Sequence, residues 1–507
     1  MNVGTTIARG AWQRAAALAT VTSLMLAMLA VLGSPVAAAT ISVPAGDEAA
    51  LRAAIADAND GDVIELAEGT YQLTNDPGPG GSLIIDDDRA LTVVGLGAGA
   101  TIEQTEDNWS VFAVDRGSLT IDNLTLTHSG DGGYGSALYV ESAWDRIEIL
   151  NSTITDNVVS GVGGGIYLDA SRTFEDDYGL EVVIRGSRFT GNEAEDEGGA
   201  IWMFNYRSLL IEDSVFQGNR ASYGGALYIE CGVCAEEDAD RITIRRTSFV
   251  GNQASLDGGA IYLWGWNELL VEGSTFAGNQ ARFGSAIYLD DWGPSDPFWS
   301  DPSQWPASDD DVTIVNSTFS GNAATGPLTA VGDGGAIYAE ADVGDVLLRS
   351  VTVADNIGGG VFSLTGAEVE IVNSLVVGSM SDDCTGDVVS LGGNIDSDGT
   401  CNLDPDLGDQ AGVSAADLGL GDLANNGGTT QTHAIDEASV AYASALAGAC
   451  PATDQRGVAR KSPCDVGAFE VPAADDDPDE PEDDEPDDPE DEAPPATPVE
   501  AQPTFTG

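Results

Sequence analysis

FVGNQASLDGGAIYLW, residues 249–264, is the stretch that decides the fold, because both of its halves recur along the chain. Seven times between positions 154 and 356 an asparagine stands three positions after a large apolar residue, and a glycine-rich strand start follows. These asparagines are Asn157, Asn192, Asn219, Asn252, Asn279, Asn322 and Asn356. With Leu126 and Val376 as outer copies, the intervals run from 23 to 43 residues, which is typical of a solenoid with loops of variable length.

Each repeat predicts short strands with one buried face. Runs such as SLLIEDSVF (208–216) and GALYIE (225–230) alternate apolar with polar or aromatic residues, and no helical period lies between them. Parallel rungs ~4.8 Å apart would stack the asparagines so that their amides bond along a column, at a corner where we expect them to take left-handed backbone geometry. The glycine pair would form the next corner, where a Cβ would collide or φ is positive. Parallel crossovers are right-handed, so the predicted fold is all-β, a right-handed parallel β-helix.

The two ends of the chain predict export. Residues 1–39 have the pattern of a signal peptide, with Arg9 and Arg14, an apolar stretch over 15–32 and small residues before Thr40; a membrane anchor is the alternative. No other stretch is apolar enough to span a bilayer. Residues 475–492 are all Asp, Glu or Pro, so 472–507 are expected to form a disordered acidic tail. We expect a secreted or cell-surface protein.

Charge and cysteines restrict the partners and the compartment. The formal charge is −65, and the tail 472–507 holds only 15 of the 84 acidic residues, so the folded part is strongly acidic as well. Such a surface repels nucleic acid and anionic membranes. Six cysteines in an exported chain suggest three disulfides, and proximity favours Cys231–Cys234, Cys384–Cys401 and Cys450–Cys464 among the possible pairings. Zinc at the CGVC segment is an alternative, but no second cysteine pair accompanies it.

Three stretches resemble known families. The FxxN and GGAI repeats resemble polymorphic outer-membrane-protein repeats, which build β-helical surface proteins. DEAALRAAIADANDGDVIELAEGTYQL (47–73) is similar to the N-terminal cap of secreted pectate-lyase-like β-helices, which contains a short amphipathic helix. Six motifs from NSLVVG (373–378) to CDVGAFE (464–470) are similar, in order, to the choice-of-anchor Q domain of bacterial surface proteins. The resemblances imply a cap at 40–75, repeats at 76–380, an anchor-type region at 381–471, a surface or outer-membrane location, and no established reaction.

A row of aromatic residues predicts a ligand-binding surface. The residue after each GGAI-type segment is Tyr139, Tyr167, Trp202, Tyr228, Tyr262, Tyr288, Tyr338 or Phe362. Strand alternation is expected to turn these rings outward into a ladder beside carboxylates, an arrangement that can bind sugars. With the Trp-rich insertion 290–311, the candidate binding residues are Trp202, Tyr228, Tyr262, Trp264, Trp266, Tyr288 and Trp292. The predicted function is a non-catalytic adhesin or glycan-binding protein; the alternative is a structural surface-layer or spacer protein whose rings stack only on one another.

Catalysis on a polysaccharide is a further alternative, as a hydrolase or lyase of the pectate-lyase-like type. Stacked rungs could hold the acid and base of an inverting glycosidase, and the candidates are Glu230, Asp290, Asp291 and Glu340. Neighbouring carboxylates also arise by chance in so acidic a chain. The GHG and RIK segments of the polygalacturonases are absent.

Calcium is the one cofactor that the sequence suggests. Asn394, Asp396 and Asp398 match the first half of a calcium-binding loop, but Pro405 stands where the last ligand is needed. A turn bounded by a disulfide explains the segment equally well. His128 and His433 have no acid or metal partner at motif spacing and are expected in surface positions or turns.

Overall fold

The computed structural model describes residues 38–74, 81–86, 88–141, 146–170, 180–231, 241–265, 268–290, 311–326, 334–340 and 343–473. Apart from positions 38–39 and 472–473, the predicted signal peptide and acidic tail lie outside these residues. The fold described here is that of the unit that ends at Val471.

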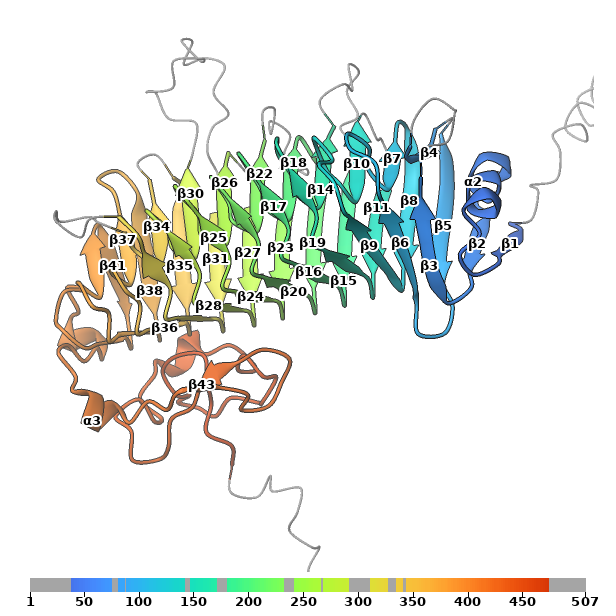
Figure 1. The fold of residues 1–507 in the computed structure, drawn as a ribbon. Coiled ribbons are helices and arrows are strands. Elements are labelled where there is room, and N and C mark those ends of the chain that lie inside the picture. The colour runs from blue at the N-terminus through green and yellow to red at the C-terminus, as the bar shows by residue number, and fades with distance from the viewer. Residues whose placement is uncertain are drawn as a thin grey trace, which may run out of the picture. The chain divides into compact units, whose positions relative to one another are not determined.

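Parallel strands coil around one axis and stack into four sheets that run along it (Figure 1). Sheet A consists of β1 (Thr40–Val43), β2 (Val63–Leu66), β5 (Arg89–Gly95), β8 (Gly117–Asp122), β11 (Arg146–Leu150), β15 (Glu181–Arg185), β19 (Ser208–Glu212), β23 (Arg241–Arg245), β27 (Glu268–Glu272), β31 (Asp311–Val315), β35 (Asp345–Arg349), β38 (Glu368–Val372) and β41 (Val388–Gly392). Sheet B consists of β3 (Gly69–Leu73), β6 (Ala100–Gln104), β9 (Leu124–His128), β12 (Thr153–Thr155), β16 (Arg188–Thr190), β20 (Val215–Gln217), β24 (Ser248–Val250), β28 (Thr275–Ala277), β32 (Thr318–Ser320), β36 (Thr352–Ala354), β39 (Leu375–Val377) and β42 (Ile395–Asp396).

The other two sheets complete the coil. Sheet C consists of β4 (Leu83–Ile85), β7 (Phe112–Val114), β10 (Leu138–Glu141), β14 (Ile166–Asp169), β18 (Ile201–Phe204), β22 (Leu227–Glu230), β26 (Ile261–Trp264), β30 (Ile287–Asp290), β34 (Ile337–Ala339), β37 (Val361–Ser363) and β40 (Cys384–Gly386). Sheet D consists of β13 (Val158–Val159), β17 (Glu193–Ala194), β21 (Arg220–Ala221), β25 (Gln253–Ala254), β29 (Gln280–Ala281) and β33 (Ala323–Ala324). The predicted parallel β-helix is confirmed, and its strands extend beyond 76–380 at both ends.

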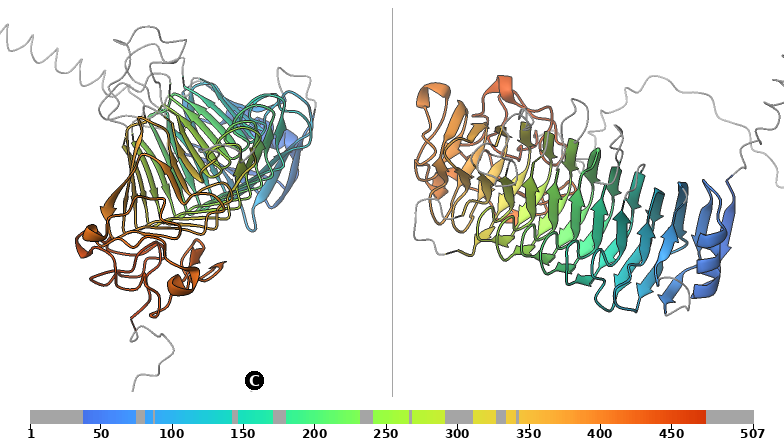
Figure 2. Two further views of the ribbon diagram at one scale, coloured as in Figure 1. Left: turned by 90° about the vertical axis from the view of Figure 1, so that its left-hand side faces the viewer. Right: turned by 90° about the horizontal axis from the view of Figure 1, so that it is seen from above.

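One turn of the coil shows how a repeat builds a rung. Strands β23, β24, β25 and β26 follow one another in sheets A, B, D and C, and each pairs with the equivalent strand of the next turn. Phe249 therefore stands in register with Phe276, and Tyr262 with Tyr288. Figure 2 shows the rungs stacked one behind another.

Inward-pointing apolar side chains fill the coil. The phenylalanines of the repeat, Phe189, Phe216, Phe249, Phe276 and Phe319, are fully buried, and their ring centroids lie 4.6–4.9 Å apart along the stack. Burying one such side chain contributes about 1.5–3 kcal/mol. Each ring fills the space at the same height in its rung, so the repeat fixes the register between turns.

The seven repeat asparagines form one buried hydrogen-bonded column. From Asn157 to Asn356, each side-chain Nδ2 donates to the Oδ1 of the next asparagine over 2.8–3.0 Å. The same Oδ1 accepts the backbone N–H of the preceding asparagine. Ser129 and Ser379 occupy the equivalent positions beyond the two ends. The column therefore runs in one direction through seven rungs.

The left-handed backbone at this corner belongs to the residue before each asparagine, and not to the asparagine as the sequence suggested. φ is +54° at Asp156 and +63° at Gly251. The glycine pair forms a second tight corner, as expected: φ is +63° at Gly198, and a Cβ on Gly199 would lie 2.2 Å from the Gly225 carbonyl oxygen. A side chain at Gly199 would therefore meet the backbone of the next rung, although Ser136 and Ser285 occupy the equivalent position in two other repeats.

Sequence analysis missed a second buried polar column, at the corner between sheets A and B. Each hydroxyl accepts the backbone N–H of the equivalent residue in the preceding rung over 3.1–3.4 Å. The residues are Ser152, Ser187, Ser214, Thr247, Ser274 and Ser317. Its signal is a Ser or Thr two positions before the apolar residue in the first six asparagine motifs.

Helix α2 (Glu48–Asp57) covers the N-terminal end of the coil, as predicted (Figure 1). The Asp47 side chain accepts the Ala50 N–H at 2.9 Å and so caps the helix. Leu51, Ala54 and Ile55 are buried and join the apolar core of the first rungs. The amphipathic helix thus shields the first rung from water.

Residues 397–471 fold back over the outer face of sheet B, and we call 420–471 the C-terminal strap. They include α3 (Ala415–Leu418), the short 3₁₀ helices η2 (Pro405–Leu407) and η3 (Ala447–Ala449), and the hairpin of β43 (Leu423–Ala424) and β44 (Thr432–His433). The Thr275 hydroxyl donates to the Gln431 carbonyl, and the Thr318 hydroxyl donates to Gln455 Oε1, each over 2.6 Å. All residues of β28, β32, β36 and β39 are buried as a result, whereas β16, β20 and β24 keep outer side chains in contact with solvent.

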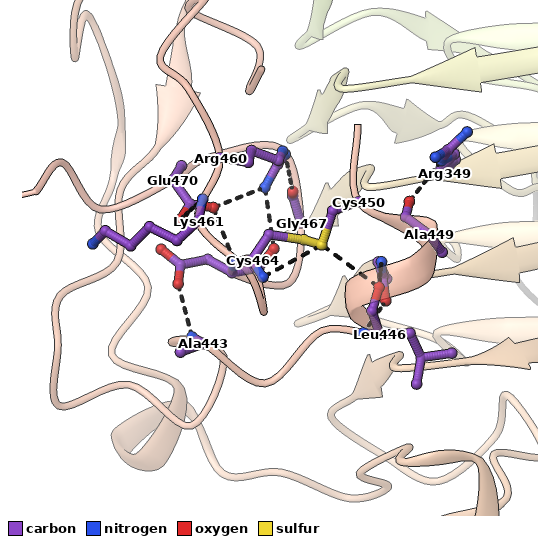
Figure 3. The surroundings of a disulfide bond; sticks show 12 residues. Arg349, Ala443, Leu446, Ala449, Cys450, Arg460, Lys461, Cys464, Gly467 and Glu470 are labelled. Atoms are coloured by element: carbon purple, nitrogen blue, oxygen red, sulfur yellow. Dashed lines mark hydrogen bonds and ion pairs between the residues drawn. A yellow bond between two sulfur atoms is a disulfide. The ribbon is translucent and has the colours of Figure 1, made fainter. Parts of the chain in front are cut away.

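The structure confirms two of the predicted disulfides, Cys384–Cys401 and Cys450–Cys464 (Figure 3). Cys231 is also disulfide-bonded, and its predicted partner Cys234 lies outside the described residues. Disulfides persist in oxidising compartments, so they fit an extracellular protein.

Removing Cys450–Cys464 should destabilise the strap. This disulfide joins residues 14 positions apart. A disulfide that closes a loop of that length stabilises the folded state by roughly 3 kcal/mol, because it restricts the conformations of the unfolded chain. We expect a Cys450→Ser/Cys464→Ser variant to melt at a lower temperature than wild type in oxidising buffer, by circular dichroism. Equal melting temperatures would show that the strap is held by its other contacts alone.

Candidate functional site

The aromatic residues of sheet C form a stacked ladder outside the apolar core. Neighbouring rings lie 4.3–5.1 Å apart, centroid to centroid, in the pairs Tyr139–Tyr167, Tyr167–Trp202, Tyr228–Tyr262, Tyr262–Tyr288, Tyr288–Tyr338 and Tyr338–Phe362. The later rings make a cluster of their own, separate from the core inside the coil. Each stacked pair adds roughly 0.5–1.5 kcal/mol, so the ladder also stabilises the fold.

The alternation pattern suggested that the whole ladder is open to solvent, but only part of it is. Tyr228, Tyr262 and Tyr288 are only 3%, 8% and 5% exposed, so the rings at its centre are buried. Tyr139 and Trp202, in earlier rungs, are half-buried, as is Trp264. Of the other candidates, Trp266, Trp292 and Asp291 lie outside the described residues. Within the described part of the chain, the accessible portion of the ladder is therefore its N-terminal end.

A second row, which sequence analysis missed, lies beside the ladder and explains part of this burial. Its members directly precede the glycine pair of each repeat. Tyr134, Tyr223 and Phe283 lean on ladder rings, with centroids 5.6, 5.4 and 5.3 Å from Tyr167, Tyr262 and Tyr338. Glu197 and Asp257 occupy the same position in intervening repeats, and Glu197 accepts the Trp202 Nε1–H at 2.8 Å. These residues do not follow the alternation of a strand, so their position before the glycine pair is the only sequence signal that identifies them.

Exposed apolar side chains gather on the first three rungs of sheet C, and we call Ile84, Trp109 and Tyr134 the N-terminal patch. They are 41%, 41% and 53% exposed. Ile84 lies on β4, Trp109 precedes β7, and Tyr134 precedes β10. The hydroxyl of Ser110, next to Trp109, donates to the Tyr134 carbonyl at 3.4 Å, which links neighbouring rungs. Large rings left this accessible are typical of a binding surface.

Carboxylates stand two positions after the ladder residue in five of its eight repeats, at Glu141, Asp169, Glu230, Asp290 and Glu340. The hydroxyls of Tyr139 and Tyr167 donate to Glu141 and Asp169 over 3.0 and 3.2 Å. The Tyr228 hydroxyl likewise donates to Glu230, whereas the hydroxyls of Tyr262 and Tyr288 donate to Asp290 and Glu340 of the next rung. Burial and the neighbouring carboxylates raise the pKa of Tyr167, Tyr228, Tyr262 and Tyr288 far above the ordinary value, so these tyrosines remain hydrogen-bond donors.

Three of the four catalytic candidates lie on nearby rungs of sheet C or directly after one of its strands. Glu230 and Asp290 both stand in register with Trp264, on its two neighbouring rungs. Glu340 follows β34, which pairs with the strand of Asp290, so these two carboxylates lie on adjacent rungs. Adjacent rungs are ~4.8 Å apart. Their use as an acid and a base stays a prediction.

A comparison with protein families identifies the architecture. The model of the family described as right handed beta helix region matches residues 99–280 and 177–376, which together make up more than half of the chain. The chain belongs to the right-handed β-helix family. A search of the curated proteins finds no match.

Two solved lyase structures match this chain at low identity. The alginate lyase AlyGC of family PL6 has a TM-score of 0.34 and 12% identity, over 86% of this chain and 58% of its own; pectate lyase Pel9A has 0.31 and 14%, over 85% and 96%. This β-helix chain thus spans less than two thirds of the alginate lyase. The polymorphic outer-membrane-protein repeats and the choice-of-anchor Q domain stay predictions. Among the described residues no helix is long and apolar enough to cross a bilayer.

The segment suggested for calcium uses its side chains in local hydrogen bonds. Asp396 is fully buried and accepts the N–H groups of Gly399, Cys401 and Gly412. Asn394 accepts the Ser374 N–H, and Asp398 accepts the Asp383 and Thr400 N–H groups. The described ranges hold no group of three or more His, Cys, Asp or Glu side chains placed to bind a metal ion. Calcium stays a prediction.

Both histidines are buried, so their predicted surface or turn positions are wrong. His433 Nε2 contacts the Ser320 hydroxyl at 2.8 Å, and its Nδ1 contacts the Gly421 carbonyl at 2.7 Å. His128 Nε2 lies 2.9 Å from the Glu106 carbonyl. His433 belongs to the strap and is buried where the strap contacts Ser320 of sheet B, which a search for metal or acid partners in the sequence could not reveal.

Glu197 should make stability fall as pH rises. Burial raises the pKa of its carboxyl above the unfolded-state value of ~4.3. Between the two pKa values the folded state binds the proton more tightly than the unfolded state, so this contribution to stability is lost as the pH rises. Glu197→Gln keeps an acceptor for Trp202 and cannot ionise. We expect its free energy of unfolding, relative to wild type, to increase from about pH 4 to neutral pH. A constant difference in urea denaturation across that range would contradict this.

Proposed function

We propose that this protein is an exported β-helix that binds a polysaccharide along sheet C without cleaving it. The observation that carries the proposal is the N-terminal patch, where Trp109 and Tyr134 expose large rings beside the accessible end of the ladder. Aromatic rings stack on the apolar faces of sugars, and polar groups beside them fix the orientation. Because the rungs repeat at ~4.8 Å, the face presents similar side chains at regular intervals along the coil, which suits a polymer of repeating units.

Export and surface attachment complete the proposal. The disulfides fit an extracellular location, and the predicted signal peptide would supply the route. The resemblance of 381–471 to a choice-of-anchor Q domain supports retention at the cell surface, where a polysaccharide-binding chain would act as an adhesin.

The test is co-sedimentation of the chain from Thr40 onward with a panel of insoluble polysaccharides. We expect wild type to bind at least one, and a Trp109→Ala/Tyr134→Ala variant to bind about tenfold more weakly, since each ring contributes on the order of 1 kcal/mol. The matched control is Leu96→Ala/Met380→Ala, which removes exposed apolar side chains outside sheet C and should bind as wild type does. Binding to no polymer, or equal binding by the ring variant, would favour a structural spacer.

Cleavage is the second candidate function, favoured by the neighbouring carboxylates Asp290 and Glu340. A hydrolase or lyase would release new chain ends from a bound polymer. Glu230→Gln and Asp290→Asn should leave binding intact in the proposed binder, with no release of reducing ends by any form. Release by wild type that either variant abolishes would establish the enzyme.

A further inference from the structure

We infer that the polymer bound on sheet C is cationic, an amino sugar polymer with free amino groups. This inference rests on the proposed function and names its ligand class. Its basis is the combination of accessible rings and carboxylates at one end of sheet C, on strands that contain no Lys or Arg.

The rings and the carboxylates form one connected surface. Tyr134 lies edge-on to Tyr167, whose hydroxyl holds Asp169, and Tyr167 stacks on Tyr139, whose hydroxyl holds Glu141. Glu141 and Asp169 stand in register on adjacent strands. A sugar seated against Tyr134 would therefore lie beside carboxylates that recur at the spacing of the rungs, ~4.8 Å.

The strands of sheet C contain no Lys or Arg, and they contain the carboxylates Glu141, Asp169, Glu230 and Asp290. Sheet A differs, because its strands contain arginines that pair with carboxylates across neighbouring rungs. Those pairs are Arg146–Glu181, Arg185–Glu212, Arg241–Glu268 and Arg245–Glu272. The strands of sheet A thus hold six arginines among eleven carboxylates, whereas the strands of sheet C hold four carboxylates and no basic residue beside the rings.

This distribution selects among polysaccharides. A polyuronate would bring its own carboxylates against those of sheet C, and like charges at an interface weaken binding. A neutral polymer would gain only the ring contacts. A polymer of amino sugars gains the ring contacts together with N–H donors and positive charge for the carboxylates, and ammonium groups are also attracted to the faces of aromatic rings.

The experiment compares soluble glucosamine oligomers with their N-acetylated counterparts of equal length, by calorimetry at mildly acidic pH. The two ligands share one backbone and differ in charge. We expect the free-amine oligomers to bind at least about tenfold more tightly, with affinity that falls as salt is added. In Glu141→Gln/Asp169→Asn that preference should shrink to about twofold, because the negative charge is removed while the exposed rings of Trp109 and Tyr134 remain.

Further binding measurements distinguish an error in the ligand class from an error in the proposed function. Equal affinity for the two oligomers, lost in the Trp109→Ala/Tyr134→Ala variant, would overturn the cationic ligand and keep the proposed function. Binding of alginate that requires calcium would also overturn it. Polylysine tests charge alone: if it binds as tightly as the oligomers and the ring variant does not weaken either, the ligand is any polycation and not a sugar. No binding to any of them would contradict the proposed function itself.

Discussion

Replacing Asn252 with leucine should lower the free energy of unfolding by roughly 3–5 kcal/mol. Asn252 is fully buried, donates to Asn279 Oδ1 and the Phe216 carbonyl, and accepts from the backbone and side-chain N–H groups of Asn219. Leucine leaves the Asn219 backbone N–H and the Phe216 carbonyl buried without these partners, and each such group costs ~1–3 kcal/mol. Urea denaturation of the two proteins measures the loss.

The matched control compares serine substitutions at two positions of the same asparagine column. Asn157 begins the column, and its Oδ1 accepts no hydrogen bond from the described residues, so Asn157→Ser removes only donated bonds. Asn252→Ser removes donated and accepted bonds together. We expect Asn252→Ser to be clearly the more destabilising, and equal losses would show that the column is not cooperative along its length.

Arg460→Ala should be comparably damaging, at roughly 3–5 kcal/mol, because it leaves the buried Glu470 without its ion pair. Both side chains are fully buried, and the Arg460 guanidinium also donates to Asn316 Oδ1 and to the Asp465 and Gly467 carbonyls (Figure 3). This one residue joins residues 465–470 of the strap to the rung of Asn316. The loss should appear as lower resistance to urea.

Arg241→Ala provides the comparison, since Arg241 pairs with Glu268 at a closer 2.6 Å but with both side chains largely exposed. Exposed pairs contribute less than ~1 kcal/mol. A destabilisation by Arg241→Ala as large as that by Arg460→Ala would mean that burial is not what makes the strap pair important.

Much of the coil could be predicted from the sequence, because the repeat acts through neighbouring rungs. Once Phe249 and Phe276 are aligned, the register of Asn252 with Asn279 and of Tyr262 with Tyr288 follows from the same offset. The glycine corners follow equally, since a Cβ there meets the backbone of the next turn. Such periodic contacts are visible in a single sequence.

The accessible part of the site could not be predicted in this way. Alternation shows that Tyr262 points away from the core, but its burial depends on Tyr223 in another row, which has no strand period. His433 is buried through a contact with Ser320, 113 positions away, made only when the strap folds back. The serine column was hidden for another reason: Ser and Thr are common beside strands, and hydrogen bonding alone distinguishes these.

Side-chain footprinting with hydroxyl radicals, with and without bound glucosamine oligomer, tests most directly whether sheet C is the binding face. Met380, 74% exposed and outside sheet C, serves as the internal reference. The account predicts that saturating oligomer protects Trp109 and Tyr134 from oxidation and leaves Met380 unchanged. Unchanged oxidation of Trp109 and Tyr134 with the oligomer bound would contradict it.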